Sequence, residues 1–208
     1  MKKLAILTIV LCLVSVSNIS AQIRFGVKAG ANFSNLYVSG DKQGINAKQY
    51  NGRFSYHFGG IMEYSFTEMF SIQPELMYIN HGANLKKENS FGMTDGHITL
   101  NTIQLPVNVK AKFNVGKNKL FVYAVPYVGY NMYGRAKGKI DGKTESVGLY
   151  KDGSDMKRVD FGVGIGAGME ISKFTIGIGN QIGQTDISGQ KGGKMKAGNI
   201  TVSAGYFF

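Results

Sequence analysis

The chain has 208 residues, a formal net charge of +11, 29 glycines, one cysteine and no tryptophan. This length is enough for one domain with a sizeable core. Beyond the extreme N-terminus, no apolar run reaches the roughly 18 residues that a spanning helix needs, so a polytopic helical membrane protein is not indicated.

Residues 1–21 have the pattern of a signal peptide. Two lysines precede the apolar run Leu4–Val16, and small residues precede an expected cleavage site after Ala21. The alternative is an N-terminal membrane anchor, for which the apolar run is too short to span comfortably. Cleavage would leave residues 22–208 as a single domain. This domain contains no cysteine, because the only one in the chain, Cys12, lies in the signal peptide. The exported domain would therefore need no disulfide.

The net charge of the exported domain indicates which class of partner it binds. Residues 22–208 carry 22 basic and 13 acidic side chains, which gives a net charge of +9. A basic surface attracts either nucleic acid or an anionic membrane. Because an exported chain rarely meets nucleic acid, we expect outer-membrane lipid and lipopolysaccharide as partners and no nucleic acid.

Beyond residue 22 the sequence alternates apolar and polar residues with a period of two, which is typical of strands with two unlike faces. Most runs have about ten residues or more, whereas soluble strands usually have about five or six. In chain order, eight strands are predicted at Ile23–Asn32, Arg53–Phe66, Phe70–Asn80, Ile103–Phe113, Leu120–Tyr133, Arg158–Glu170, Phe174–Gly183 and Asn199–Phe208.

Two of these strands have an irregular pattern. Ile98 and Leu100 are out of phase with the fourth strand, and a bulge near Asn101–Thr102 would restore the register. In the fifth strand apolar residues lie on both faces. We expect its outer apolar face to consist of Phe121, Tyr123, Val125 and Tyr127.

The connections alternate in length along the chain. Three are short, at Thr67–Met69, Asn114–Lys119 and Ser172–Lys173. Four are long and polar, at Asn35–Gly52, Ala83–His97, Gly134–Met156 and Gln184–Lys194. Strands joined in this way place the long loops at one end of the sheet, and the tight turns and both chain ends at the other.

Large residues lie on the apolar face of the strands, while glycines and polar residues lie on the opposite face. In lipid every backbone polar group needs a partner, and a closed barrel supplies one at both sheet edges. The pattern therefore predicts an all-β, eight-stranded, antiparallel up-and-down transmembrane β-barrel with short periplasmic turns and long extracellular loops. We expect a monomer in the bacterial outer membrane. Its terminal Tyr206 and Phe208 would be the signal read by the barrel-insertion machinery.

Several stretches carry a resemblance to a known family. They are "FGVKAGANFS" after the signal peptide, "FSIQPELMYINHG" at Phe70–Gly82, "IQLPVNVKAKF" at Ile103–Phe113, "DFGVGIGAGMEI" at Asp160–Ile171 and the terminal "GYFF". Through them the chain resembles the PorT-type outer-membrane β-barrel proteins of Bacteroidetes. The resemblance implies an eight-stranded outer-membrane barrel, and one branch of the family is linked to protein secretion across that membrane.

Glycine recurs at every second position of "DFGVGIGAGM". A dinucleotide fingerprint needs a different spacing and a following helix, so the run does not indicate a phosphate site. We expect these glycines to form a bare inner wall of the barrel that favours curvature or leaves room for long side chains such as Arg24 and Arg53. The predicted glycine wall comprises Gly162, Gly164, Gly166, Gly168, Gly177 and Gly179.

Charged residues on the polar face form the strongest candidate site. Buried charges must pair, so we expect interior salt bridges among Arg24, Arg53, Glu63 and Glu75 that fill a lumen too narrow for a porin channel. The predicted interior polar network comprises Arg24, Arg53, His57, Glu63, Glu75 and Lys110. The three histidines have no metal-ligand spacing, and we expect no metal and no cofactor.

Three functions remain open. The first is a non-enzymatic barrel that is structural or binds a protein partner through its extracellular loops. The second is a PorT-like component of protein secretion. The third is a lipid-modifying enzyme, with His81 and Ser90, or His97, near the outer rim. Loop lysines, including Lys137, suit lipopolysaccharide phosphates or simply a solvated surface.

Overall fold

The computed structural model describes residues 22–39, 50–85, 94–140, 143–150, 157–185 and 194–208. The predicted signal peptide, residues 1–21, lies outside them. Nine strands are present: β1 (Gln22–Ser39), β2 (Tyr50–Ser65), β3 (Phe70–Leu85), β4 (Thr94–Val115), β5 (Asn118–Ile140), β6 (Lys143–Gly148), β7 (Val159–Ile171), β8 (Phe174–Gly183) and β9 (Lys194–Phe207). Among the described residues, no helix is long and apolar enough to cross a membrane.

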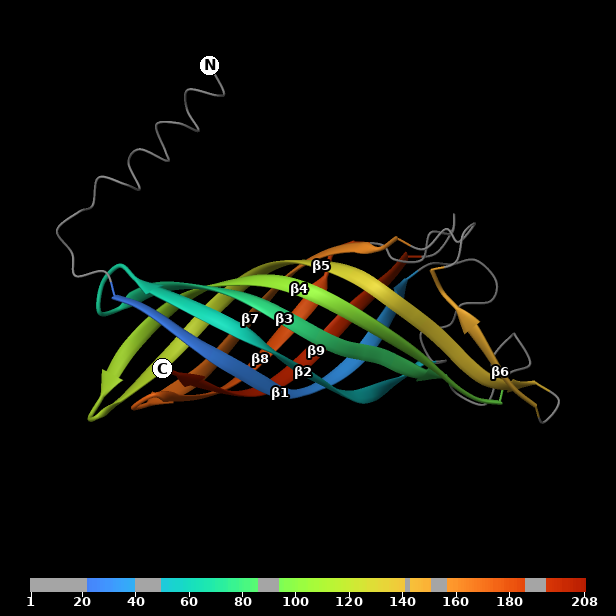
Figure 1. Cartoon of the computed structure of the whole chain (residues 1–208), viewed down its shortest axis with the longest axis horizontal. Helices are drawn as coiled ribbons and strands as arrows, with labels where there is room; N and C mark the ends of the chain where they lie inside the picture. The colour runs from blue at the N-terminus through green and yellow to red at the C-terminus, as the bar shows by residue number, and fades with distance from the viewer. Residues whose placement is uncertain (1–21, 40–49, 86–93, 141–142, 151–156, 186–193) are drawn as a thin grey trace, which may run out of the picture.

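Eight of the strands close into a barrel (Figure 1). Each pairs antiparallel with its neighbours in the order β4-β3-β2-β1-β9-β8-β7-β5, and β4 pairs with β5 to complete the ring. Closure between the first and last strands comes from the long β1–β9 ladder, in which Gly26 is opposite Phe207 and Ser39 is opposite Lys194. The closed antiparallel barrel predicted from the alternation is confirmed.

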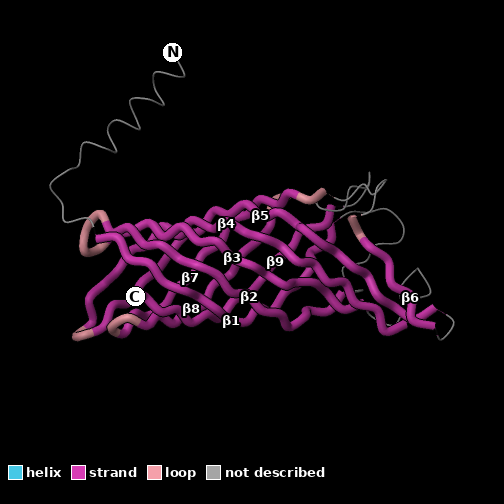
Figure 2. Tube along the Cα trace, in the orientation of Figure 1, coloured by secondary structure: helices cyan, strands magenta, loops and turns pink. Residues whose placement is uncertain are grey.

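Figure 2 shows the strands running nearly the whole length of the molecule, joined at one end by short turns. These turns separate β2 from β3, β4 from β5 and β7 from β8, and the C-terminus lies at the same end. The β4–β5 turn uses Gly116 with a φ of 61°, a left-handed conformation that favours glycine.

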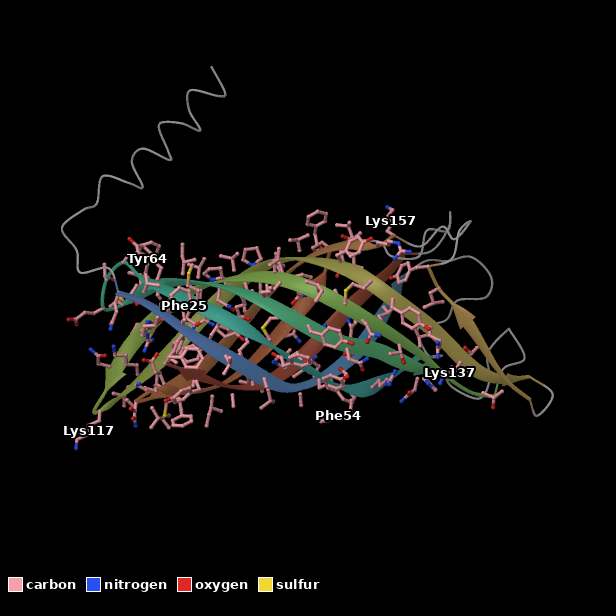
Figure 3. The ribbon with its side chains drawn as sticks, in the orientation of Figure 1. Phe25, Phe54, Tyr64, Lys117, Lys137 and Lys157 are labelled. Atoms are coloured by element: carbon pink, nitrogen blue, oxygen red, sulfur yellow. The ribbon has the colours of Figure 1, made fainter. Side chains whose placement is uncertain are left out.

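The outer wall of the barrel is apolar. The strands present large exposed side chains at alternate positions, and sticks project outward along the whole barrel in Figure 3. Exposed aromatic residues include Phe70 and Phe174 beside the short turns and Phe33, Phe54 and Tyr130 toward the opposite end. Figure 3 labels Tyr64 near the turn end. An apolar band between two aromatic girdles is the surface that a transmembrane barrel presents to lipid.

β5 is the strand whose predicted faces are wrong. Phe121, Val125 and Tyr127 are only 5%, 1% and 6% exposed, so they face the lumen with Tyr123. Val122, by contrast, is on the exposed outer wall. The alternation alone could not separate these faces because both are apolar. The orientation follows from β7, where glycines lie opposite Phe121, Tyr123 and Tyr127.

The bulge expected near Asn101–Thr102 is present, but its extra residue is in the neighbouring strand. Asn101 pairs with Tyr133 and Thr102 with Asn131, so β5 contributes the unpaired Met132. β4 itself keeps its alternation, and Leu100 is only 3% exposed, on the same face as the buried Thr102. The phase change expected for Leu100 is therefore wrong.

One strand was not anticipated. The expected loop Gly134–Met156 is in part a ribbon, in which β5 continues to Ile140 and pairs with β6. β6 pairs with no other described strand and lies beyond the barrel in Figure 1. Between the two strands the sequence reads Asp141–Gly142, a strong signal for a two-residue hairpin.

Candidate functional site: the filled lumen

Glu63 is the centre of the charged part of the lumen. Its side chain is fully buried, and its carboxylate accepts hydrogen bonds from Arg24 at 2.5 Å and from Lys112 at 2.6 Å. Lys110 approaches the second oxygen at 3.4 Å. One carboxylate thus lies among three cations. Because unpaired charges are costly in such a site, the cluster depends on this group.

Arg24 joins this centre to a second carboxylate. Its guanidinium donates to both oxygens of Glu170 in β7, at 2.7 and 2.9 Å, in the bidentate geometry that suits a planar guanidinium. The same group lies over the ring of Phe207 in β9, 4.2 Å from its centre. Arg24 therefore links strands on opposite sides of the β1–β9 closure.

A second group of polar side chains lies beside the first. Lys28 pairs with Glu75, which also accepts hydrogen bonds at 2.6 Å from Gln73 and from Asn108. Lys110 donates to the side-chain oxygen of Gln73 and so joins the two groups. Both carboxylate oxygens of Glu75 therefore have a partner, as a buried anion requires.

The predicted network members are placed as follows. Arg24, Glu63, Glu75 and Lys110 lie together in the lumen. His57 is buried further along, with its Nδ1 2.6 Å from the side-chain oxygen of Asn32. The expected pairing of Arg53 with Glu63 or Glu75 is wrong, because Arg53 instead donates to the Ile98 carbonyl and to Thr99 near the opposite end of β4.

Sequence reasoning missed Lys112 as a member of the cluster. Lys112 lies two residues after Lys110 and therefore on the same face of β4, which was the available signal. The pairing of Arg24 with Glu170 could not be read from the sequence because it depends on closure of the ring between β1 and β9. The pairing of Lys28 with Glu75 depends on the stagger of β1 relative to β3. His81 is buried, with its Nε2 2.8 Å from the Thr102 hydroxyl.

The glycine wall is filled by aromatic rings from the adjacent strand. Phe121, Tyr123 and Tyr127 of β5 pair with Gly168, Gly166 and Gly162 of β7. A Cβ added to these glycines would lie 2.3 to 2.4 Å from the paired ring. Glycine opposite an aromatic residue is a known way to seat a ring flat against a neighbouring strand. The wall therefore does not leave its space to Arg24 or Arg53.

The wall continues onto β8. Gly168 pairs with Gly177 and Gly166 pairs with Gly179, so the two rings of Phe121 and Tyr123 each cover two glycines in a row. A Cβ on Gly179 would lie 2.3 Å from the Tyr123 hydroxyl. At Gly164 a backbone group rather than a ring excludes a side chain, because a Cβ would lie 2.5 Å from the Asn180 carbonyl oxygen.

Among the described residues, little space is left inside the barrel. Two voids of about 30 and 20 Å³ lie between the charged group and the rings, lined by Lys28, Glu75, Asn108 and Tyr123 among others. Such volumes suit one or two water molecules and nothing larger. Among the described residues, no group of histidine, cysteine or carboxylate side chains could hold a metal ion.

In the part of the chain that the structure describes, the histidines proposed for a lipid-modifying enzyme do not form a catalytic arrangement. His81 contacts Thr102, whose hydroxyl donates to Asn131, and Ser90 lies outside the description. His97 lies on β4, where Arg53 and Lys137 are its charged neighbours. Neither histidine has a carboxylate to orient it in its described contacts, as a nucleophile-activating base would need.

Tyr206 and Phe208 lie at the C-terminal end of β9. Phe208 is 69% exposed, and Tyr206 contacts the rings of Phe174 and Phe208 on the outer wall. Phe207, between them, is buried beneath Arg24. The ending thus presents aromatic rings to lipid at alternate positions, as the sequence pattern predicts, and its role in insertion stays a prediction.

Comparison with known proteins identifies a family whose model matches most of the chain. A family model described as "Outer membrane protein beta-barrel domain" matches residues 17–189. No curated protein matches the chain.

Solved structures similar to the chain include Ail, the attachment invasion locus protein of Yersinia pestis, at 19% identity, covering 89% of this chain and 98% of that one, with a TM-score of 0.43. Neisserial surface protein A is 12% identical, with 88% and 97% covered and a TM-score of 0.46. OprG of Pseudomonas aeruginosa is 16% identical, with 89% and 94% covered and a TM-score of 0.36.

Proposed function

Because the chain belongs to the outer-membrane protein β-barrel domain family, we propose that it is a closed, non-enzymatic barrel that acts through its extracellular end. The observation that carries the proposal is the filled lumen. Ion pairs centred on Glu63 occupy one side, and rings from β5 occupy the other. Such an interior leaves no path for a solute, so we expect the function to depend on the part of the barrel outside the membrane. The proposal includes a monomer that needs no cofactor.

The β5–β6 ribbon supports binding of a protein partner. It extends the barrel wall together with the start of β4, whose Thr94 lies opposite Lys139, and one edge of β6 pairs with no described strand. An unpaired strand edge can accept a strand of another chain through backbone hydrogen bonds. The ribbon also carries exposed polar side chains at Thr144 and Ser146. Such side chains suit a surface that is hydrated when free and contacts a protein when the partner binds.

Crosslinking in intact cells tests the partner. A photo-reactive amino acid replaces Ser146 on β6, and a matched control replaces Lys117 in the turn at the opposite end of the barrel, labelled in Figure 3. We expect a discrete protein adduct from position 146 that position 117 does not give. Identical adducts at both positions, or no protein adduct from any exposed position of the ribbon, would contradict partner binding.

The resemblance to PorT-type barrels supports a second proposal, in which the partner is a component of protein secretion. The same adducts decide it, because mass spectrometry identifies the crosslinked chain. Secretion proteins recovered from position 146 and co-purified with the barrel would favour this function over a structural one. Incubation of the purified barrel with lipopolysaccharide tests the non-enzymatic part, since unchanged acyl chains are expected.

A further inference from the structure

A second cluster of charged residues lies outside the lumen, near the extracellular end of β4 and β5. Six side chains surround a hollow of about 280 Å³ there, four of them basic: Arg53, His97, Thr99, Tyr133, Arg135 and Lys137. We refer to them as the rim cluster. No carboxylate is among the described residues that line the hollow.

Strand pairing builds the rim cluster. In the β4–β5 ladder His97 is opposite Lys137 and Thr99 is opposite Arg135, which places these four side chains in two adjacent cross-strand pairs. Thr99 shares its face of β4 with the lipid-facing Leu105, six residues further along the strand. The cluster therefore opens sideways on the outer wall rather than into the lumen.

Arg53 reaches the cluster from two strands away. A register shift in β2 between Gly52 and Tyr56 re-aims this part of the strand. The Arg53 guanidinium then crosses β3 to donate to the Ile98 carbonyl at 3.1 Å and to the Thr99 hydroxyl. Both contacts are to neutral acceptors, so the positive charge of Arg53 stays uncompensated among the described residues.

The depth of the cluster follows from the aromatic girdle. Tyr130 and Tyr133 of β5 are about half exposed on the outer wall, and the Arg135 guanidinium lies 5.2 Å from the Tyr133 ring centre. Arg135 and Lys137 are two and four residues further toward the extracellular end, at about 3.3 Å per residue along the strand. This places them just above the apolar band, at the level of lipid headgroups.

The positive charges of the rim cluster repel one another. His97 lies beyond the apolar band, and burial lowers its pKa below the usual value, as do the nearby charges of Arg53 and Lys137. Two guanidiniums, an ammonium and two hydroxyls around one hollow match the oxygens of a phosphate group, which arginine can bind in a bidentate way. An anion in the hollow would offset the mutual repulsion.

We propose that the rim cluster binds a phosphate group on the headgroup of an outer-leaflet glycolipid, taken up from the side of the barrel. The guanidiniums of Arg53 and Arg135 hold the phosphate oxygens, and Lys137 adds a third positive charge. Thr99 keeps Arg53 in place through its hydroxyl. This site does not depend on whether the lumen is closed, so either proposal can fail without the other.

The test measures glycolipid bound to the full-length barrel in nanodiscs. Lipid A with its phosphates is compared with dephosphorylated lipid A by native mass spectrometry, and inorganic phosphate is titrated separately. The test variant is Arg135→Gln with Lys137→Gln, which breaks no described hydrogen bond. Its control is Lys117→Gln with Lys119→Gln at the turn end, which removes the same charge. A further variant, Arg53→Gln, tests the crossing arginine.

We expect phosphorylated lipid A to bind the wild type and the control equally, and the test variant about tenfold more weakly. Dephosphorylated lipid A should bind all three equally weakly. Equal binding of phosphorylated lipid A to the wild type and the test variant would overturn the proposal. So would loss of binding in the control alone. Strong saturation by inorganic phosphate alone would overturn the glycolipid as the ligand and identify a free-phosphate site.

Discussion

The two sides of the lumen are filled by different chemistry. On the β1–β4 side, long charged side chains reach inward and Glu63 holds three cations together. On the β7–β8 side there are glycines, and the rings of β5 lie flat over them. The charged side depends on pairing between side chains. The glycine side depends on shape, because the rings fit only where no Cβ intervenes.

The lumen of a narrow barrel can thus be filled in two ways, and the two fillings respond differently to substitution. Removing one charge from the first side leaves its partners buried and unpaired, a cost that no small movement relieves. Adding one carbon to the second side creates a steric conflict that a ring can partly relieve by shifting.

The largest effect is expected for Glu63→Gln. The substitution keeps the shape of the side chain but leaves Arg24, Lys110 and Lys112 without their shared anion. We expect the free energy of unfolding to fall by about 3–5 kcal/mol. Urea unfolding of the refolded barrel in liposomes, followed by far-ultraviolet circular dichroism, measures it.

The control is Glu68→Gln in the exposed β2–β3 turn, which changes the net charge equally. It should leave unfolding unchanged. Equal stability of the Glu63 and Glu68 variants would show that the charged side does not depend on pairing.

A smaller effect is expected for Gly166→Ala. The new Cβ would lie 2.3 Å from Cζ of Tyr123 and 2.6 Å from the Ile178 carbonyl oxygen. Because backbone cannot move as freely as a ring, we expect a loss of about 1–3 kcal/mol by the same unfolding measurement. Gly166→Leu should hinder folding more severely.

Gly60→Ala is the matched control, since a Cβ at this glycine of β2 meets nothing within 4 Å. A loss confined to position 166 supports packing as the cause. Equal losses at 60 and 166 would indicate a general effect of alanine in strands instead.

The smallest effect is expected for Tyr127→Phe. The Tyr127 hydroxyl donates to Asp160 at 3.1 Å, and the second oxygen of this buried carboxylate has no described partner. Loss of the donor should cost about 1 kcal/mol while the ring stays against Gly162. Comparison with Tyr130→Phe, on the exposed outer wall, isolates the hydrogen bond from the general effect of removing a hydroxyl. Equal midpoints for both variants would contradict it.

Much of the barrel could be predicted because lipid makes strong demands on each strand. The alternation between lipid-facing and lumen-facing positions fixes a strand's orientation wherever the two faces differ. In β7, for example, Val163 and Ile165 alternate with glycines, and the faces are as predicted. In β5 the same reasoning failed, since Phe121 and Val122 are equally apolar and only the glycines across the ladder decide between them.

The candidate site was harder to predict than the fold. Which charges face inward follows from alternation, so Arg24, Glu63 and Glu75 could be found. Which charges meet depends on strand stagger and on closure of the ring, which bring Arg24 to Glu170 across 146 positions of sequence. Arg53 shows a further limit, because the register shift beside it in β2 cannot be read from the pattern.

Conductance of single barrels in a planar bilayer tests the filled lumen most directly. We expect no stable open current for the wild type at voltages where a 16-stranded porin in the same bilayer conducts steadily. Insertion is verified in the same membrane by protease protection of the strands. A large, long-lived current through the verified wild-type barrel would contradict the account.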